Sequence, residues 1–247
     1  MSRLAIFSDV HGNESAFDAC LDDAEAQGAT EYLCLGDQSN FGPQPAQTLE
    51  KLKMMNCPVV MGNTDQRLLE PRTLADFKND DEDAKLKHDI ETWCAAQLDE
   101  NHKAFIKTFK PYIELEFQSL KILAYHGSPQ SFNDTIVPTT SLETLDDFFS
   151  DLTADIYVGG HTHVQFIKPY HRNRLMNPGS VGQAHVKVSG RYILQPEVAE
   201  YLLLNVVSGE PNVTLRRVPY KLTELEQEVK ASDMPHRKRW LEEFKQA

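Results

Sequence analysis

Residues 3–13 read RLAIFSDVHGN, a short apolar run followed at once by an acid and a histidine, Asp9 and His11. The run is continuously apolar rather than alternating, which is typical of a strand covered on both faces. Residues 13–27 then carry a helical pattern. This order predicts an α/β fold with a ligand site where the strand ends, because clefts in such folds form at the carboxyl ends of the strands.

The same order repeats further along the chain. YLCLGD (32–37) and PVVMGN (58–63) are predicted to be strands, with a helix over residues 46–55 between them. Residues 66–111 are charged and helical in pattern, so we expect two or three helices there and no strand. We therefore predict one domain over residues 1–247, with a helical cap inserted at about 66–111.

Strand patterns return after the insert. YIELEFQSLKILAYHG (112–127) predicts a hairpin, and a helix is expected near residues 139–150. The strands after residue 155 follow one another with turns between them, so we expect antiparallel pairing in a second sheet. Residues 222–245 should be helical, with an interruption near Pro235.

Composition narrows the class of protein. The 247 residues are 40% hydrophobic and 25% charged, the figures of an ordinary globular protein. No apolar run is long enough to span a membrane, and the first apolar stretch is too short for a signal peptide, so a cytoplasmic location is expected. A net charge of −12 argues against binding of long nucleic acids. The four cysteines are scattered, without a CxxC pair, and are expected to be reduced thiols.

Potential metal ligands stand at the ends of five predicted strands. They are Asp9, His11, Asp37, Asn63, His126, His161 and His163. Each alone is a weak signal, since a Gly-Asp pair after a strand is usually a turn. Together they form an oxygen and nitrogen set suited to manganese, iron, zinc or nickel. Seven ligands are too many for one tetrahedral ion and fit two ions that share a carboxylate.

The order of these motifs, D-x-H, G-D, G-N, H and G-H-x-H, resembles the calcineurin-like metallophosphoesterases. The likeness runs from Asp9 to NPGSVG at 177–182 and is greatest to the small bacterial and archaeal phosphodiesterases. It implies a four-layer α/β/β/α sandwich of two mixed sheets and two divalent transition metal ions, manganese before iron, zinc or nickel. By this resemblance Asp9, His11 and His163 hold one ion, Asn63, His126 and His161 hold the other, and Asp37 bridges both.

The resemblance also implies a reaction. A hydroxide bridging the two ions would attack a small phosphate ester or nucleotide, more readily a diester. The residues expected to take part in catalysis are Asp37, Asn63, Thr64, Asp65 and His126. The residues expected to contact substrate are Asn63, Thr64, Gly179 and Ser180.

Thr64 departs from the pattern of many family members. Those members have a histidine here that protonates the leaving group, and the next acid, which is Asp65 in this chain, steadies its ring. A threonine hydroxyl is too weak an acid for that task. We therefore expect slow hydrolysis of esters whose leaving group needs a proton, unless His88, His102 or His185 supplies it.

Two other functions fit the same fold. A serine/threonine protein phosphatase would favour a basic groove for its substrate, whereas this chain is acidic. A non-catalytic protein-binding module, such as a retromer subunit of this fold, would favour lost ligands, whereas all seven positions are filled. Antiparallel strands late in the chain leave an edge that would allow an oligomer.

Overall fold

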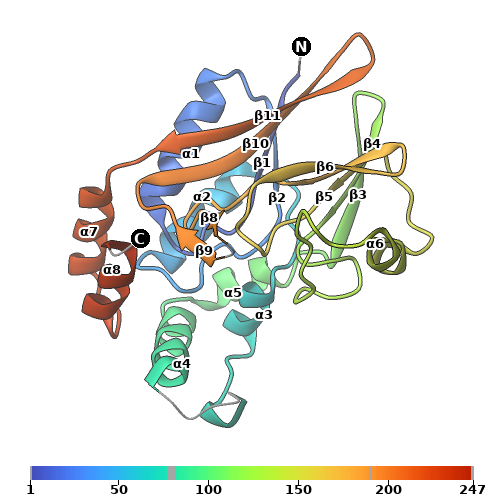
Figure 1. Ribbon diagram of the computed structural model, residues 1–247. Helices are drawn as coiled ribbons and strands as arrows, with labels where there is room; N and C mark the ends of the chain where they lie inside the picture. Colours follow the sequence, from blue (N-terminus) through green and yellow to red (C-terminus); the bar gives the residue numbers. More distant parts are fainter. Residues whose placement is uncertain (1, 77–81, 190, 246–247) are drawn as a thin grey trace.

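The strand that opens the chain lies inside the first of two large sheets. The structure is a computed structural model that describes residues 2–76, 82–189 and 191–245 (Figure 1). The strands of this sheet are β1 (Leu4–Phe7), β2 (Glu31–Cys34), β10 (Val198–Val207) and β11 (Glu210–Pro219). β1 is parallel to β2 and antiparallel to β10, which gives the order β11-β10-β1-β2.

The second sheet is also mixed. Its strands are β3 (Tyr112–Phe117), β4 (Leu120–Tyr125), β5 (Ile156–Val158), β6 (Phe166–Tyr170) and β7 (Asn173–Asn177). The order is β3-β4-β5-β7-β6, with three parallel strands in the middle and an antiparallel strand at each edge. A separate ribbon pairs β8 (His185–Val188), which the sequence analysis did not predict, with β9 (Arg191–Leu194).

Apolar side chains from both sheets meet in one core between them. Ile6 and Leu33 of the first sheet pack there with Ile122 and Val158 of the second. The outer face of the first sheet is covered by α1 (Glu14–Ala26), next to which lies α2 (Pro45–Met55). The outer face of the second is covered by α6 (Leu142–Phe149). The predicted four-layer α/β/β/α sandwich is confirmed.

Two details differ from the sequence-based expectation. Antiparallel strands were expected in the second sheet, but β10 and β11 join the first, because β10 is apolar on both faces and fits an interior position. Residues 58–63 were expected to be a strand, but only Val59 and Val60 form isolated bridges there. A helix has already begun at Asn63.

The helical insert leaves the first sheet and returns to it at one place. The amide of Met61 donates to the carbonyl of Lys110 at 2.7 Å, and the amide of Lys110 donates to Val59 at 3.0 Å. The helices between these points are α3 (Asn63–Leu69), the 3₁₀ turn η1 (Leu74–Asp76), α4 (Glu82–Ala96) and α5 (Glu100–Ile106). Because its two ends are tied together, the insert projects from one edge of the sandwich (Figure 1).

The chain closes with two further helices, α7 (Leu222–Ala231) and α8 (Arg237–Lys245), on either side of the expected break. Trp240 and Phe244 of α8 join the core on the outer side of the first sheet. No helix within the described ranges combines the length and apolarity needed to cross a lipid bilayer.

Candidate metal centre

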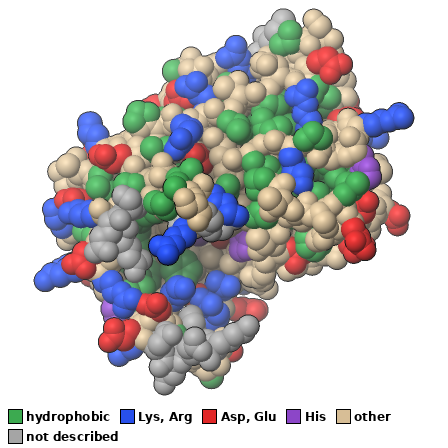
Figure 2. All heavy atoms as spheres, in the orientation of Figure 1, with side chains coloured by type: hydrophobic (Ala, Val, Ile, Leu, Met, Phe, Trp, Pro, Cys, Tyr) green, Lys and Arg blue, Asp and Glu red, His purple; other side chains and the backbone are tan. Residues whose placement is uncertain are grey.

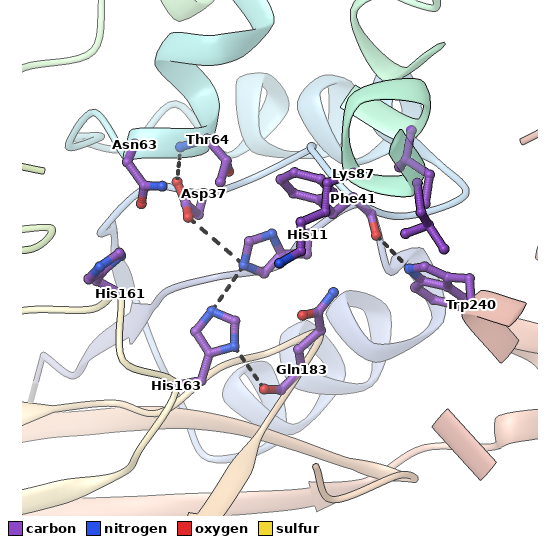
Figure 3. A pocket seen from close by; sticks show the side chains of 12 residues that line it. His11, Asp37, Phe41, Asn63, Thr64, Lys87, His161, His163, Gln183 and Trp240 are labelled. Carbon is purple, nitrogen blue, oxygen red and sulfur yellow. Dashed lines mark hydrogen bonds and ion pairs between the residues drawn. The ribbon is translucent and has the colours of Figure 1, made fainter. Parts of the chain in front are cut away.

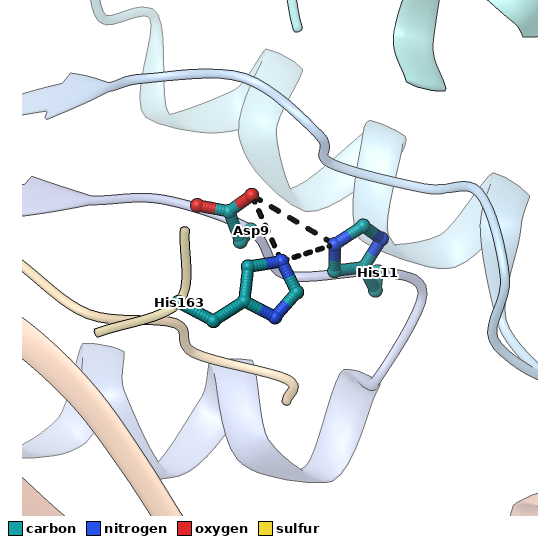
Figure 4. Close-up of side chains that lie close together, drawn as sticks. All are labelled: Asp9, His11 and His163. Atoms are coloured by element: carbon teal, nitrogen blue, oxygen red, sulfur yellow. Dashed lines mark hydrogen bonds and ion pairs between the residues drawn. The ribbon is translucent and has the colours of Figure 1, made fainter. Parts of the chain in front are cut away.

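The first cluster of potential metal ligands combines residues of the first motif, D-x-H, with a histidine of the last, G-H-x-H. The loops after β1 and β5 bring Asp9, His11 and His163 together (Figure 4). Asp9 Oδ1 lies 3.2 Å from His163 Nε2 and 3.8 Å from His11 Nε2, and the two Nε2 atoms are 3.0 Å apart. Three donor atoms thus converge on one point from residues more than 150 positions apart.

A second cluster lies beside the first. Donor atoms of Asp37, His126 and His161 all lie within 4.8 Å of one another. His126 Nε2 is 3.4 Å from Asp37 Oδ2 and 3.0 Å from Asn63 Oδ1. Asp37 Oδ2 is also 3.9 Å from His11 Nε2. Asp37 therefore stands between the two clusters, where a shared carboxylate would be needed.

The histidine rings are oriented by backbone carbonyls. Nδ1 of His11 lies 3.0 Å from the oxygen of Asn40, and Nδ1 of His163 lies 3.0 Å from that of Gln183. Nδ1 of His126 lies 2.8 Å from the oxygen of Leu35. A carbonyl can only accept, so each Nδ1 carries a hydrogen, and each ring in its neutral form turns the lone pair of Nε2 toward the clusters. This is the usual outer support of metal-binding histidines.

Each carboxylate is held by one oxygen and leaves the other toward the site. Asp9 Oδ2 accepts from the Ser8 hydroxyl at 2.5 Å and from the His161 amide at 3.0 Å. Asp37 Oδ1 accepts from the Thr64 amide at 2.8 Å. Asp9 Oδ1 is buried without a hydrogen bond from any described residue. Such an oxygen is costly unless a cation neutralises it, so these residues fit divalent metal ions.

Burial and the charges within the clusters shift the pKa values of their members. Burial alone would raise the pKa of Asp9, but the positive charge of the nearby His163 lowers it to about 2. Burial and the charge of His163 lower the pKa of His11 to about 4. Burial opposes the charge of Asp37 at His126, yet Asp37 prevails and raises the pKa of His126 to about 9. A bound cation would displace that proton, as metal binding to imidazole generally does.

The backbone is strained at these ligands. Five of them have positive φ angles between 49° and 67°, which is uncommon for residues other than glycine. They are Asp9, His11, Asp37, His161 and His163. Strain of this kind collects at functional sites because the surrounding structure must hold it in place. It is an indication of function independent of the ligand distances.

Glycines make room for the carboxylates. A Cβ on Gly62 would lie 2.1 Å from Asp37 Oδ1, and one on Gly160 would lie 2.9 Å from Asp9 Oδ2. Two glycines, Gly159 and Gly160, stand directly before His161. In the structure Gly160 lies against the Asp9 carboxylate, and Gly159 packs against the ring of Tyr125.

Thr64 and Asp65 have different surroundings. Thr64 lines the cavity over the clusters, and its buried hydroxyl has no hydrogen-bond partner among the described residues. Asp65 is fully buried behind it and accepts from the amides of Asp37 at 2.7 Å, Gln38 at 2.9 Å and Gly62 at 3.0 Å. Both of its oxygens are already occupied, an arrangement that suits a positioning role for Asp65 better than a direct contact with substrate.

Gly179 and Ser180 lie behind the site rather than in it. The Ser180 hydroxyl donates to the carbonyl of Asp9 at 2.7 Å and accepts from the Gln183 amide at 2.8 Å. Gly179 packs against Glu200. Neither residue lines the cavity, so the structure favours support of the Asp9 loop over the substrate contact expected for them.

The cavity over the clusters has a volume of about 300 Å³ (Figure 3). The predicted site residues that line it are His11, Asp37, Asn63, Thr64, His161 and His163. Asp9 and His126 are fully buried beneath them. None of the suggested proton donors lines it: His88 contacts the Arg72 carbonyl, His102 pairs with Glu50, and His185 contacts the Gln183 carbonyl.

Six lining residues were not predicted from the sequence. They are Phe41, Leu86, Lys87, Ile90, Gln183 and Trp240. They come from a loop, from α4, from the segment before β8 and from α8, and none belongs to a motif. Only the way these segments pack brings them to the cavity.

The chain is similar to known proteins in sequence and in fold. The sequence profile of the calcineurin-like phosphoesterase superfamily domain matches residues 2–198. A protein of Methanocaldococcus jannaschii, MJ0912, described as uncharacterized, is 26% identical over 195 residues, which cover 79% of this chain and 75% of the relative.

Two solved structures share the fold over nearly the whole chain. A metallophosphoesterase from Sphaerobacter thermophilus has a TM-score of 0.74 at 20% identity, with 99% of this chain and 98% of that chain covered. The hypothetical protein PH1004 from Pyrococcus horikoshii has a TM-score of 0.78 at 16% identity, with 98% of this chain and 97% of that chain covered. At these identities the likeness shows the fold alone.

Proposed function

Since the chain belongs to the calcineurin-like phosphoesterase superfamily, we propose that it is a metal-dependent phosphohydrolase that acts on small phosphate esters, on diesters before monoesters. Asp9, His11 and His163 would hold one divalent ion, and Asn63, His126 and His161 the other. Asp37 would bind both. Manganese is the first candidate because carboxylate and amide oxygens suit it, and iron, zinc or nickel are the alternatives because imidazole nitrogens suit them.

The observation that carries this proposal is the position of Asp37. Its Oδ2 lies within 3.9 Å of a histidine nitrogen in each cluster, while its Oδ1 is held by a backbone amide. Two ions bound there would supply the ionised water expected between them and the positive charge that phosphoester hydrolysis needs. The protein's own part is to fix the ligands beforehand through the carbonyls that orient the histidine rings.

Thr64 favours esters whose leaving group departs without a proton. Its hydroxyl can donate a hydrogen bond to a phosphate oxygen but cannot release a proton at neutral pH. The phosphodiesterases that the sequence resembles also lack a histidine at this position. Esters with a leaving group that departs unprotonated, such as aryl diesters, are therefore expected to be the better substrates.

The test begins with protein stripped of metal and reloaded separately with manganese, iron, zinc or nickel. Metal content is measured by mass spectrometry, and hydrolysis of bis(p-nitrophenyl) phosphate is compared with that of p-nitrophenyl phosphate. We expect about two ions per chain and faster cleavage of the diester. His126→Ala should lose metal and activity together, whereas His171→Ala, which removes a half-exposed histidine paired with Asp146, should lose neither.

Three experimental results would argue against the proposed function or its ligand set. Metal binding without turnover of any ester would favour a non-catalytic protein-binding module on this fold. Faster hydrolysis of a phosphoserine peptide than of either small ester would favour a protein phosphatase. Full activity of the His126→Ala variant would exclude the proposed ligand set.

A further inference from the structure

The cavity continues from the metal-ligand clusters toward the cap and the C-terminal helix. In Figure 3, Asn63 and His161 lie at one end and Trp240 at the other, with His11 between them. The half of the cavity near Trp240, which we call the far half, is lined by side chains that have no role in the proposed hydrolysis. Its apolar part consists of Phe41, Leu86, Ile90 and Trp240.

This apolar part forms a fixed wall. Leu86, Ile90 and Trp240 are 7%, 0% and 5% exposed and belong to one hydrophobic core, to which α4 and α8 both contribute. Phe41 has φ of 71°, which is unusual for an aromatic residue, and its carbonyl accepts from Trp240 Nε1 at 3.0 Å. A strained backbone thus holds a half-buried aromatic ring at the cavity.

Two polar side chains, Lys87 and Gln183, stand at the edge of this wall. Lys87 is exposed on α4 and lines the cavity, and no carboxylate in the described ranges pairs with its ammonium group. The side-chain amide of Gln183 also lines the cavity and forms no hydrogen bond with a described residue. Figure 2 shows Lys and Arg side chains over the region of α4 and α8, although the chain carries a net charge of −12.

We infer that the far half of the cavity binds the heteroaromatic base of a nucleotide ester whose phosphate lies at the metal ligands. This inference rests on the proposed function. The base would lie against Phe41 and the apolar wall, and the amide of Gln183 would hydrogen-bond to its polar edge. Lys87 would contact an oxygen of the phosphate. A cavity of about 300 Å³ suits a small ligand of this kind.

The test uses two phosphates that differ only in the base. Dissociation constants of AMP and of ribose 5-phosphate are measured by isothermal titration calorimetry on manganese-loaded protein, with released phosphate assayed in parallel. We expect AMP to bind at least about tenfold more tightly, because an aromatic ring placed in an apolar subsite is worth that factor. In Phe41→Ala the dissociation constant of AMP should rise close to that of ribose 5-phosphate. Phe41→Leu should restore part of the difference between the two constants.

Matched variants separate the subsite from general effects. Lys87→Met should weaken both ligands by a similar factor of about five, and this loss should disappear at about 0.5 M salt because exposed charges are then screened. Lys85→Met, on the same helix but outside the cavity, should change neither constant. Phe105→Ala removes another half-buried ring in the cap and should leave the ratio of the two constants unchanged.

The outcomes distinguish this inference from the proposed function. Equal binding of AMP and ribose 5-phosphate by the unmodified protein would overturn the base subsite, even if aryl diesters were hydrolysed. A ratio that survives in Phe41→Ala would also overturn it. A clear preference for AMP in a protein that hydrolyses no ester would instead overturn the proposed function and leave the subsite standing.

Discussion

Asp65 offers a direct test of how the ligand loops are held. Its Oδ2 accepts from the amides of Asp37 and Gly62, and its Oδ1 accepts from the amide of Gln38. An asparagine has one accepting oxygen and one donating amide group. Whichever way the side chain is turned, Asp65→Asn therefore sets its NH₂ against at least one backbone N–H in the fully buried interior.

The loss can be worked out from these contacts. Leaving one buried N–H without an acceptor costs about 1–3 kcal/mol. Burial and the nearby charge of Asp37 raise the pKa of Asp65 to about 7, so the substitution also removes some repulsion. We expect a net loss of about 1–2 kcal/mol in the free energy of unfolding. Metal affinity should fall roughly 10- to 100-fold, as when outer support of ligands is removed.

The measurements are urea unfolding in the presence of EDTA and calorimetric titration with manganese. Asp155→Asn is the control, because Asp155 is exposed and also accepts a backbone amide, that of Lys121 at 2.8 Å. It should change stability by no more than about 0.5 kcal/mol and leave metal affinity unchanged. If Asp65→Asn unfolds at the same urea concentration as the unmodified protein and binds metal equally well, Asp65 does not position the loops.

Two further predictions concern a missing acid and a buried carboxyl group. Thr64→His should raise kcat about tenfold for alkyl diesters and less for aryl diesters, because only alkoxide leaving groups need a proton; equal gains would contradict the reasoning. Glu228 accepts from the Ser15 hydroxyl, and burial, aided by the charge of Glu14, raises its pKa to about 7. Since the folded protein disfavours the carboxylate, its cost to stability is absent below about pH 4.5 and grows as pH rises through 7. Glu228→Gln should thus be about 1 kcal/mol more stable than the unmodified protein at about pH 8, after discounting for partial exposure. At about pH 4, where the carboxyl group is protonated in both the folded and the unfolded state, it should be no more stable. Urea unfolding that gives the same difference at both pH values would rule this out.

Local pattern in the sequence is enough to locate most strands and the ligands at their ends. The apolar run before Asp9, and those before Asp37 and His126, each predict a strand and the point where it stops. The break near Pro235 follows from the missing amide of proline. These features depend on residues a few positions apart, so they can be read without knowing the fold.

The packing of distant segments decided the rest. β10 lies beside β1 because both of its faces are apolar, which periodicity alone does not assign to one sheet. Asp65 turns its carboxylate to the backbone of the Asp37 loop, although its place beside Thr64 suggested a role in the cavity. Lys87 and Trp240 reach that cavity from helices α4 and α8, which contain none of the sequence motifs of the site. Contacts between segments far apart in sequence form only when the whole core is packed, and for that reason they leave no local trace in the sequence.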